Sequence, residues 1–153
     1  MLIAEFLGTL ILVATVVGSG IMATNLTNDI GLQLTMNMLA TVFVLFLIIS
    51  MFGPISGAHF NPAVSLVFLI TKGISPSLFI AYLLVQFTGA IAGAVLANIM
   101  FELPVEISSR ERLSAATSVS EVVATVGLLL TILLLIKYNR NLVAVGVAAW
   151  IGA

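Results

Sequence analysis

The chain alternates between long apolar runs and short polar interruptions. A helix needs about 20 apolar residues to cross a hydrocarbon core of ~30 Å, and four runs are that long. These runs cover residues 2–22, 33–52, 77–101 and 119–136. A fifth run begins at Leu142 and continues to Ala153, about 12 residues that are too few to cross alone. Because no run alternates like a strand, we expect an all-α integral membrane protein with four spans and the start of a fifth.

The composition supports this class and excludes several others. Hydrophobic residues make up 61% of the chain and charged residues 7%, whereas a soluble domain averages roughly 25% charged residues. The net charge of −1 gives no reason to expect a nucleic-acid partner, and the lack of cysteine excludes disulfides. No nucleophile–base pair, phosphate loop or metal-ligand cluster is visible in the sequence, so we expect neither an enzyme nor a cofactor.

Residues 53–65, between the second and third long runs, combine several helix-breaking residues. Pro62 suits the first position of a helix, and Asn61 before it is a natural N-cap. The apolar run that follows is too short to span and ends near Gly73. Residues 57–60 should therefore be non-helical backbone, which a membrane tolerates only where protein buries it or a wet cavity adjoins it. This pattern predicts a re-entrant loop and a half-helix whose positive N-terminal end points into the membrane.

The same stretch resembles the first signature loop of the aquaporin, or major intrinsic protein, family. The string that carries the resemblance is Ser56-Gly57-Ala58-His59-Phe60-Asn61-Pro62-Ala63-Val64. The resemblance implies an aquaporin-like right-handed helical bundle. In the complete family fold, six spans and two half-helices form one pore per subunit, usually in a homotetramer. This chain looks like an N-terminal portion that carries the first Asn-Pro-Ala loop alone.

An internal repeat agrees with this architecture. Residues 4–9 are similar to residues 120–125, since Glu5 and Thr9 recur as Glu121 and Thr125. Three apolar runs separate the two starts, so the second copy would run in the opposite direction, as in inverted-repeat transport folds. We expect a first repeat at 1–101 with the re-entrant segment at 53–71, a connecting loop at 102–118, and the start of a second repeat at 119–153.

The resemblance implies roles for the loop residues. The amide of Asn61, in the motif with Pro62 and Ala63, would donate a hydrogen bond to passing water while the half-helix dipole repels protons and cations. Backbone carbonyls would form a ladder of acceptors at Gly57, Ala58, His59 and Phe60. His59 is the only histidine, and no set of metal ligands surrounds it in the sequence, so we expect it to present its carbonyl.

Among the polar side chains within the spans, two glutamates and one glutamine are candidates for holding the re-entrant loop. A carboxylate inside a membrane is costly and needs partners, which applies to Glu5 and Glu121. The resemblance implies that each accepts hydrogen bonds from a re-entrant loop and that Gln86 braces the loops as well. Other interpretations are an interfacial or proton-relaying glutamate and a plain helix–helix hydrogen bond from Gln86. Gly89 and Gly93 form a small-xxx-small pair that allows close helix packing.

Selectivity is the least determined property. In the family, residues of the second span, the fifth span and the second loop narrow the pore, and the first two positions fall at Thr41 and near Ala153. Threonine in place of a large aromatic would widen the constriction and admit small neutral solutes such as glycerol or metalloid hydroxides. Thr41 could instead face a neighbouring helix. The second Asn-Pro-Ala loop, and the arginine that follows it in the family, are absent from this sequence. Arg110, Arg112 and Arg140 lie in polar loops, and none of them follows such a triplet.

Three functions remain open. The first is a passive aquaporin-type channel in the cell membrane, with the lipid bilayer and water or small neutral solutes as partners. The second is a secondary transporter that uses Glu5 or Glu121 as its coupling site. The third is a non-conducting fragment. Half a pore would leave the polar backbone of the loop without its partner loop, so we expect residues 1–153 alone not to form a selective channel.

Overall fold

The computed structural model describes residues 1–106 and 114–153 of the chain. This part contains helices and no strand: α1 (Leu2–Leu26), α2 (Ile30–Ser56), α3 (Pro62–Ile70), α4 (Pro76–Met100), α5 (Ala115–Tyr138), the 3₁₀ helix η1 (Arg140–Leu142) and α6 (Val143–Gly152). Helices α1, α2, α4 and α5 are long and apolar enough to cross a membrane. The prediction of an all-α membrane protein with four spans is confirmed. Arg110 and Arg112 lie outside the described residues.

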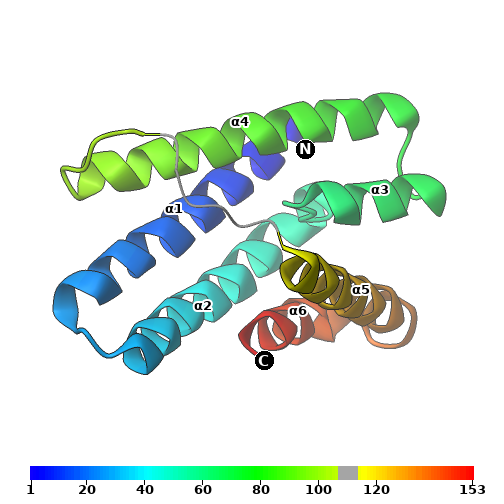
Figure 1. Cartoon of the computed structure of the whole chain (residues 1–153). Coiled ribbons are helices and arrows are strands. Elements are labelled where there is room, and N and C mark those ends of the chain that lie inside the picture. Colours follow the sequence, from blue (N-terminus) through cyan, green and yellow to red (C-terminus); the bar gives the residue numbers. More distant parts are fainter. Residues whose placement is uncertain (107–113) are drawn as a thin grey trace.

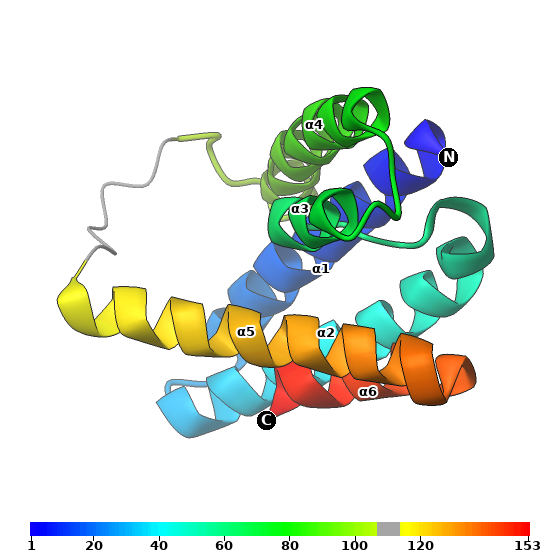
Figure 2. The same cartoon turned by 90° about the vertical axis from the view of Figure 1, so that its right-hand side faces the viewer.

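The helices form two groups that meet at α2. Helix α1 packs on α4 and on α2, and its contact with α4 is the most extensive in the described structure. The short helix α3 lies beside α4, as Figure 1 shows. Figure 2 shows α5 and α6 side by side, with α6 packed on α2 and α5 touching α3. The loop before α3 is thus placed between the two groups of helices.

Two glycines allow α4 to approach the backbone of α1. A Cβ atom on Gly89 would lie 2.7 Å from the carbonyl oxygen of Phe6, and one on Gly93 would lie 2.5 Å from that of Leu10. No larger side chain fits at such distances from a neighbouring backbone. The small-xxx-small pair therefore acts as the sequence indicates, and it sets the distance between α1 and α4.

Helix α2 continues beyond the end that the sequence predicts. The expected loop begins at Gly53, whereas the helix runs through Gly53 and Pro54 to Ser56. Proline lacks an N–H, so Pro54 removes one intrahelical hydrogen bond, and only Ile55 and Ser56 follow it before the helix ends. The helix ends at Gly57, which has φ 89° and donates its N–H to the Gly53 carbonyl at 3.1 Å. The second span is therefore longer than predicted, and the non-helical segment before α3 is confined to residues 57–61, which include the predicted 57–60.

Several other helices also extend beyond their predicted ends. Helix α1 reaches Leu26, and α2 begins after Asp29, whose side chain accepts from the Leu32 N–H at 2.9 Å. Helix α5 begins at Ala115, where the Ser114 hydroxyl caps its first turn. The connection predicted at 102–118 is correspondingly shorter, and the division into two inverted repeats stays a prediction.

Candidate functional site

Asn61 caps the short helix α3 as the sequence predicts. Its Oδ1 accepts from the N–H groups of Ala63 at 2.7 Å and Val64 at 3.3 Å, and Pro62 occupies the first helical position. Since both bonds end on the oxygen, the amide nitrogen Nδ2 faces the other way. That nitrogen has no hydrogen-bond partner in residues 1–106 or 114–153, and Asn61 lines a cavity.

The loop before α3 has a backbone conformation that side chains usually avoid. Gly57, Ala58 and Phe60 have φ values of 89°, 51° and 47°, all in the left-handed region. This region costs a residue other than glycine roughly 1–2 kcal/mol. Two of the three residues carry a side chain, so contacts with the rest of the protein must hold the loop in place.

The Glu5 carboxylate provides these contacts. It is fully buried, with an exposed fraction of 0%. Its Oε1 accepts from the Ser56 hydroxyl at 2.6 Å and the His59 N–H at 3.0 Å, and its Oε2 accepts from the Phe60 N–H at 2.8 Å and Gln86 Nε2 at 3.0 Å. Four donors from α2, the loop and α4 surround the two oxygens, so this one side chain ties the loop to both helices.

The same bonds orient the loop carbonyls. The Ala58 N–H donates to the Ser56 hydroxyl at 3.1 Å, while those of His59 and Phe60 donate to Glu5. In a planar trans peptide, each carbonyl points opposite to the N–H of the next residue. The carbonyls of Gly57, Ala58 and His59 are therefore directed away from Glu5. No hydrogen bond within the described residues ends on them, and all three residues line the cavity.

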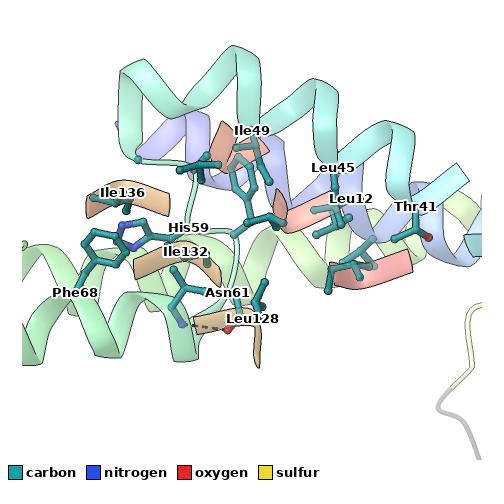
Figure 3. A pocket seen from close by; sticks show the side chains of 18 of the residues that line it. Leu12, Thr41, Leu45, Ile49, His59, Asn61, Phe68, Leu128, Ile132 and Ile136 are labelled. Atoms are coloured by element: carbon teal, nitrogen blue, oxygen red, sulfur yellow. Dashed lines mark hydrogen bonds between the residues drawn. The ribbon is translucent and has the colours of Figure 1, made fainter. Parts of the chain in front are cut away.

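The cavity has a volume of about 330 Å³ and lies between the two groups of helices. Figure 3 shows Thr41 at one end and His59, Phe68 and Ile136 at the other. Three helices each contribute three residues spaced by four, so each of them presents one row to the cavity. These rows are Thr41, Leu45 and Ile49 of α2, Leu128, Ile132 and Ile136 of α5, and Val143, Val147 and Ile151 of α6. Apart from Thr41 the rows are aliphatic, and they face a loop that carries the polar groups.

Thr41 is the polar side chain at its end of the cavity. Its hydroxyl donates to the Asn37 carbonyl at 2.8 Å, so its oxygen retains lone pairs but has no free proton. The Asn37 amide in turn donates to the Val16 carbonyl at 2.7 Å and to the Ser19 hydroxyl at 2.9 Å. These bonds tie α2 to α1 one turn before Thr41.

Three polar residues of this site were missed by the sequence analysis. They are Ser56, Ser65 and Tyr82. The Ser65 hydroxyl bonds Gln86 Nε2 and His59 Nδ1, each at 3.0 Å. The Tyr82 hydroxyl donates to the Ser56 carbonyl at 2.7 Å. All three are buried. Their signal in the sequence is that of Glu5: polar side chains inside membrane helices need partners. Tyr82 also lies four residues before Gln86, on the same face of α4.

The structure does not bring the other candidate residues to the site. Glu121 is exposed on α5 and has no hydrogen bond to the described residues. Arg140 and Ala153 are exposed and do not line the cavity. Among residues 1–106 and 114–153, no three His, Asp or Glu side chains gather as metal ligands.

Comparison with known proteins places the chain in a family. The family model described as "Major intrinsic protein" matches residues 1–153. The chain belongs to the major intrinsic protein family. It is 49% identical over 142 residues to "Aquaglyceroporin AqpS" of Rhizobium meliloti (strain 1021). The matched segment covers 92% of this chain and 61% of that protein. Together with its four apolar helices, this membership makes it a multi-pass integral membrane protein.

Two mouse members of the family match shorter segments. "Aquaporin-4" is 37% identical over 91 residues, or 60% of this chain and 28% of its own length. "Aquaporin-8" is 45% identical over 62 residues, or 40% of this chain and 24% of its own length. The chain thus spans less than two thirds of the length of each of these relatives.

Proposed function

We propose that a passive pore of the aquaporin type runs through the cavity and conducts water and small neutral solutes such as glycerol or metalloid hydroxides. One observation carries this proposal: the loop anchored by Glu5 presents three free carbonyls and the unpaired Asn61 amide at a cavity whose other lining is mostly apolar. Water would donate to the carbonyls and accept from Asn61. The positive end of α3 at Asn61 would repel cations. The relative named an aquaglyceroporin supports the wider solute range.

The roles of the bracing residues belong to this proposal. Glu5 and Gln86 would hold the loop, and the Phe60 carbonyl would extend the ladder of acceptors. Glu5 already accepts four hydrogen bonds, which disfavours its use as a coupling site for a transported proton. We also propose the two inverted repeats and, for the assembled channel, a homotetramer. The family relation favours a channel over an enzyme.

Stopped-flow light scattering on proteoliposomes tests the function. Vesicles are shrunk with sucrose and then with glycerol, and they contain residues 1–153 or the longer product if the reading frame continues. Shrinkage faster than in empty vesicles, independent of a proton gradient, supports the pore. If the longer product alone conducts, the expectation that residues 1–153 are not a selective channel also holds. Uptake driven by a proton gradient would overturn the proposal in favour of a transporter.

Substituting phenylalanine for Thr41 is expected to separate the solutes. A large ring at the end of the cavity would narrow it, so glycerol permeability should fall roughly tenfold, the scale on which pocket shape discriminates small substrates. Water permeability should fall much less. The control is Thr88→Phe, because Thr88 is exposed on α4 and outside the cavity. Equal glycerol permeability in the Thr41→Phe and Thr88→Phe proteins would show that Thr41 does not form the constriction.

Substituting aspartate for Asn61 is expected to change the charge selectivity of the pore without unfolding α3. Aspartate caps a helix as well as asparagine does, but it lacks the Nδ2 donor and adds a negative charge. Osmotic water permeability should fall, and cation leak, measured with a fluorescent dye inside the vesicles, should rise. The control is Ser75→Asp at the N-cap of α4, away from the cavity. A cation leak equal to that of the Ser75→Asp protein would contradict the role given to Asn61.

A further inference from the structure

The Phe60 ring lies in a notch of α1 that Gly8 leaves open. A Cβ atom at Gly8 would lie 2.0 Å from Cε1 of the ring, 2.4 Å from Cζ and 2.6 Å from Cδ1. A contact between two carbon atoms is comfortable at about 3.5–4.0 Å, so these distances are much too short. The ring in this place and a side chain at position 8 therefore exclude one another.

One face of α1 holds both the backbone and the ring of Phe60. Glu5 and Gly8 are three residues apart, so they share a face of the helix. The Glu5 carboxylate accepts from the Phe60 N–H at 2.8 Å, while the ring covers Gly8. A movement of the loop would break this buried hydrogen bond, whereas a rotation of the side chain would not. If the notch were filled, we therefore expect the ring to move rather than the loop.

Core side chains occupy the other directions around the ring. Phe60 is buried in a cluster with Leu45 and Ile48 of α2 and Ala148 of α6. The Phe52 ring meets the Phe60 ring edge to face, with centroids 6.1 Å apart. The direction that remains open is the cavity of about 330 Å³, which Phe60 itself lines. A ring that is pushed off α1 would therefore enter the cavity.

We propose that Gly8 sets the width of the pore, because it seats the Phe60 ring against α1 and so leaves room in the cavity for a polyol. This inference rests on the proposed channel function and names a residue that determines its solute range. Gly8 does not line the cavity, so it acts through Phe60 and is a positioning residue. Since glycerol is larger than water, a ring displaced into the cavity should obstruct glycerol far more than water.

The ratio of glycerol permeability to water permeability tests the width. In the form of the protein that conducts in proteoliposomes, Gly8→Ala should lower glycerol permeability roughly tenfold and water permeability much less. The control is Gly20→Ala on the same helix, where a Cβ atom meets Asn37 Nδ2 at an ordinary 3.5 Å. That variant should keep the ratio of the unchanged protein. An unchanged ratio in the Gly8→Ala protein, including a proportional loss of both permeabilities, would overturn the proposal.

A second substitution tests whether the effect passes through Phe60. Leucine at position 60 has no atoms that correspond to Cε1 and Cζ, the two ring atoms nearest to the added Cβ. In a Phe60→Leu background, Gly8→Ala should therefore leave the permeability ratio unchanged. If Gly8→Ala lowers the ratio equally in both backgrounds, the ring does not transmit the effect and the proposal fails.

Thermal unfolding separates this inference from the channel function. For residues 1–153 in detergent, Gly8→Ala should lower the unfolding midpoint, because the Phe60 ring leaves its core cluster. In the Phe60→Leu background the same change should be neutral or raise the midpoint, since alanine favours a helix over glycine. An equal change in both backgrounds would show that Gly8 does not seat the ring. If no form of the protein conducts, the channel function fails and the role in pore width with it, while the midpoints still decide whether Gly8 seats the ring.

Discussion

Replacing Glu5 with leucine is expected to disorder the loop before α3 and to abolish conduction. The side chains are similar in size, so the change removes acceptors rather than volume. Four hydrogen bonds would be lost, and the buried N–H groups of His59 and Phe60 would have no other acceptor among the described residues. The Ser56 hydroxyl keeps only a long bond to the Phe52 carbonyl at 3.5 Å, and Gln86 Nε2 keeps its bond to Ser65. Each buried N–H without a partner costs about 1–3 kcal/mol. Because the loop also has left-handed backbone at two residues that are not glycine, it has no reason to keep its shape once these bonds are lost.

Two measurements check this expectation. The midpoint of thermal unfolding in detergent should fall clearly, and the amides of His59 and Phe60 should exchange hydrogen much faster. The matched control is Glu121→Leu, which removes a carboxylate that is exposed and makes no hydrogen bond to the described residues. That variant should unfold at the same temperature as the unchanged chain. If both substitutions have equal effects, the hydrogen bonds of Glu5 are not what holds the loop.

The contrast between these two glutamates shows which structural roles a local sequence pattern can predict and which it cannot. Both occur in similar six-residue segments near the start of a span, and the sequence predicts the same bracing role for both. The structure brings Glu5 to a loop and leaves Glu121 exposed. A carboxylate in an apolar run indicates that partners are needed, but the partners themselves lie elsewhere in the chain. For Glu5 they lie more than fifty residues away in α2, the loop and α4.

The start of α3 was predictable because its signals are local. Asn61 and Pro62 have preferred helix positions that follow from their own chemistry, and they adopt them. The end of α2 was less predictable, because proline usually interrupts a helix, whereas α2 continues for two residues after Pro54. Whether a proline is in the last turn depends on where the helix ends, and Gly57 decides that through its left-handed conformation.

The conformation of the loop could not be predicted. Ala58 and Phe60 adopt a backbone region that their residue types disfavour, and contacts made in three dimensions hold them there. The bond between His59 and Ser65 has the same origin. Six residues separate them, and only the curvature of the loop brings the ring back to the first turn of α3. The candidate pore residues were therefore predictable by type and place, whereas the network that orients them was not.

Replacing Gly93 with valine is expected to separate α1 from α4 and to destabilise the fold strongly. The first atom of the new side chain would lie 2.5 Å from the Leu10 carbonyl oxygen and 3.1 Å from the Ala14 nitrogen. These are backbone atoms of a helix, so no side-chain rotation can relieve the overlap. Overpacking a core typically costs roughly 1–3 kcal/mol, and a clash with backbone should reach or exceed the upper end. The loss of stability is measured by denaturant unfolding of the protein in mixed micelles.

The consequence should extend to the pore, because the same interface holds Gln86 against Glu5. Moving α4 away from α1 would lengthen the 3.0 Å bond between them and loosen the loop, so permeability should fall together with stability. The control is Gly53→Ala, since a Cβ atom at Gly53 has nothing within 4 Å. That variant should be neutral or slightly more stable, because alanine favours the helix by about 1 kcal/mol over glycine. A Gly93→Val protein as stable as the Gly53→Ala protein would mean that α1 and α4 are not held at backbone contact in the membrane.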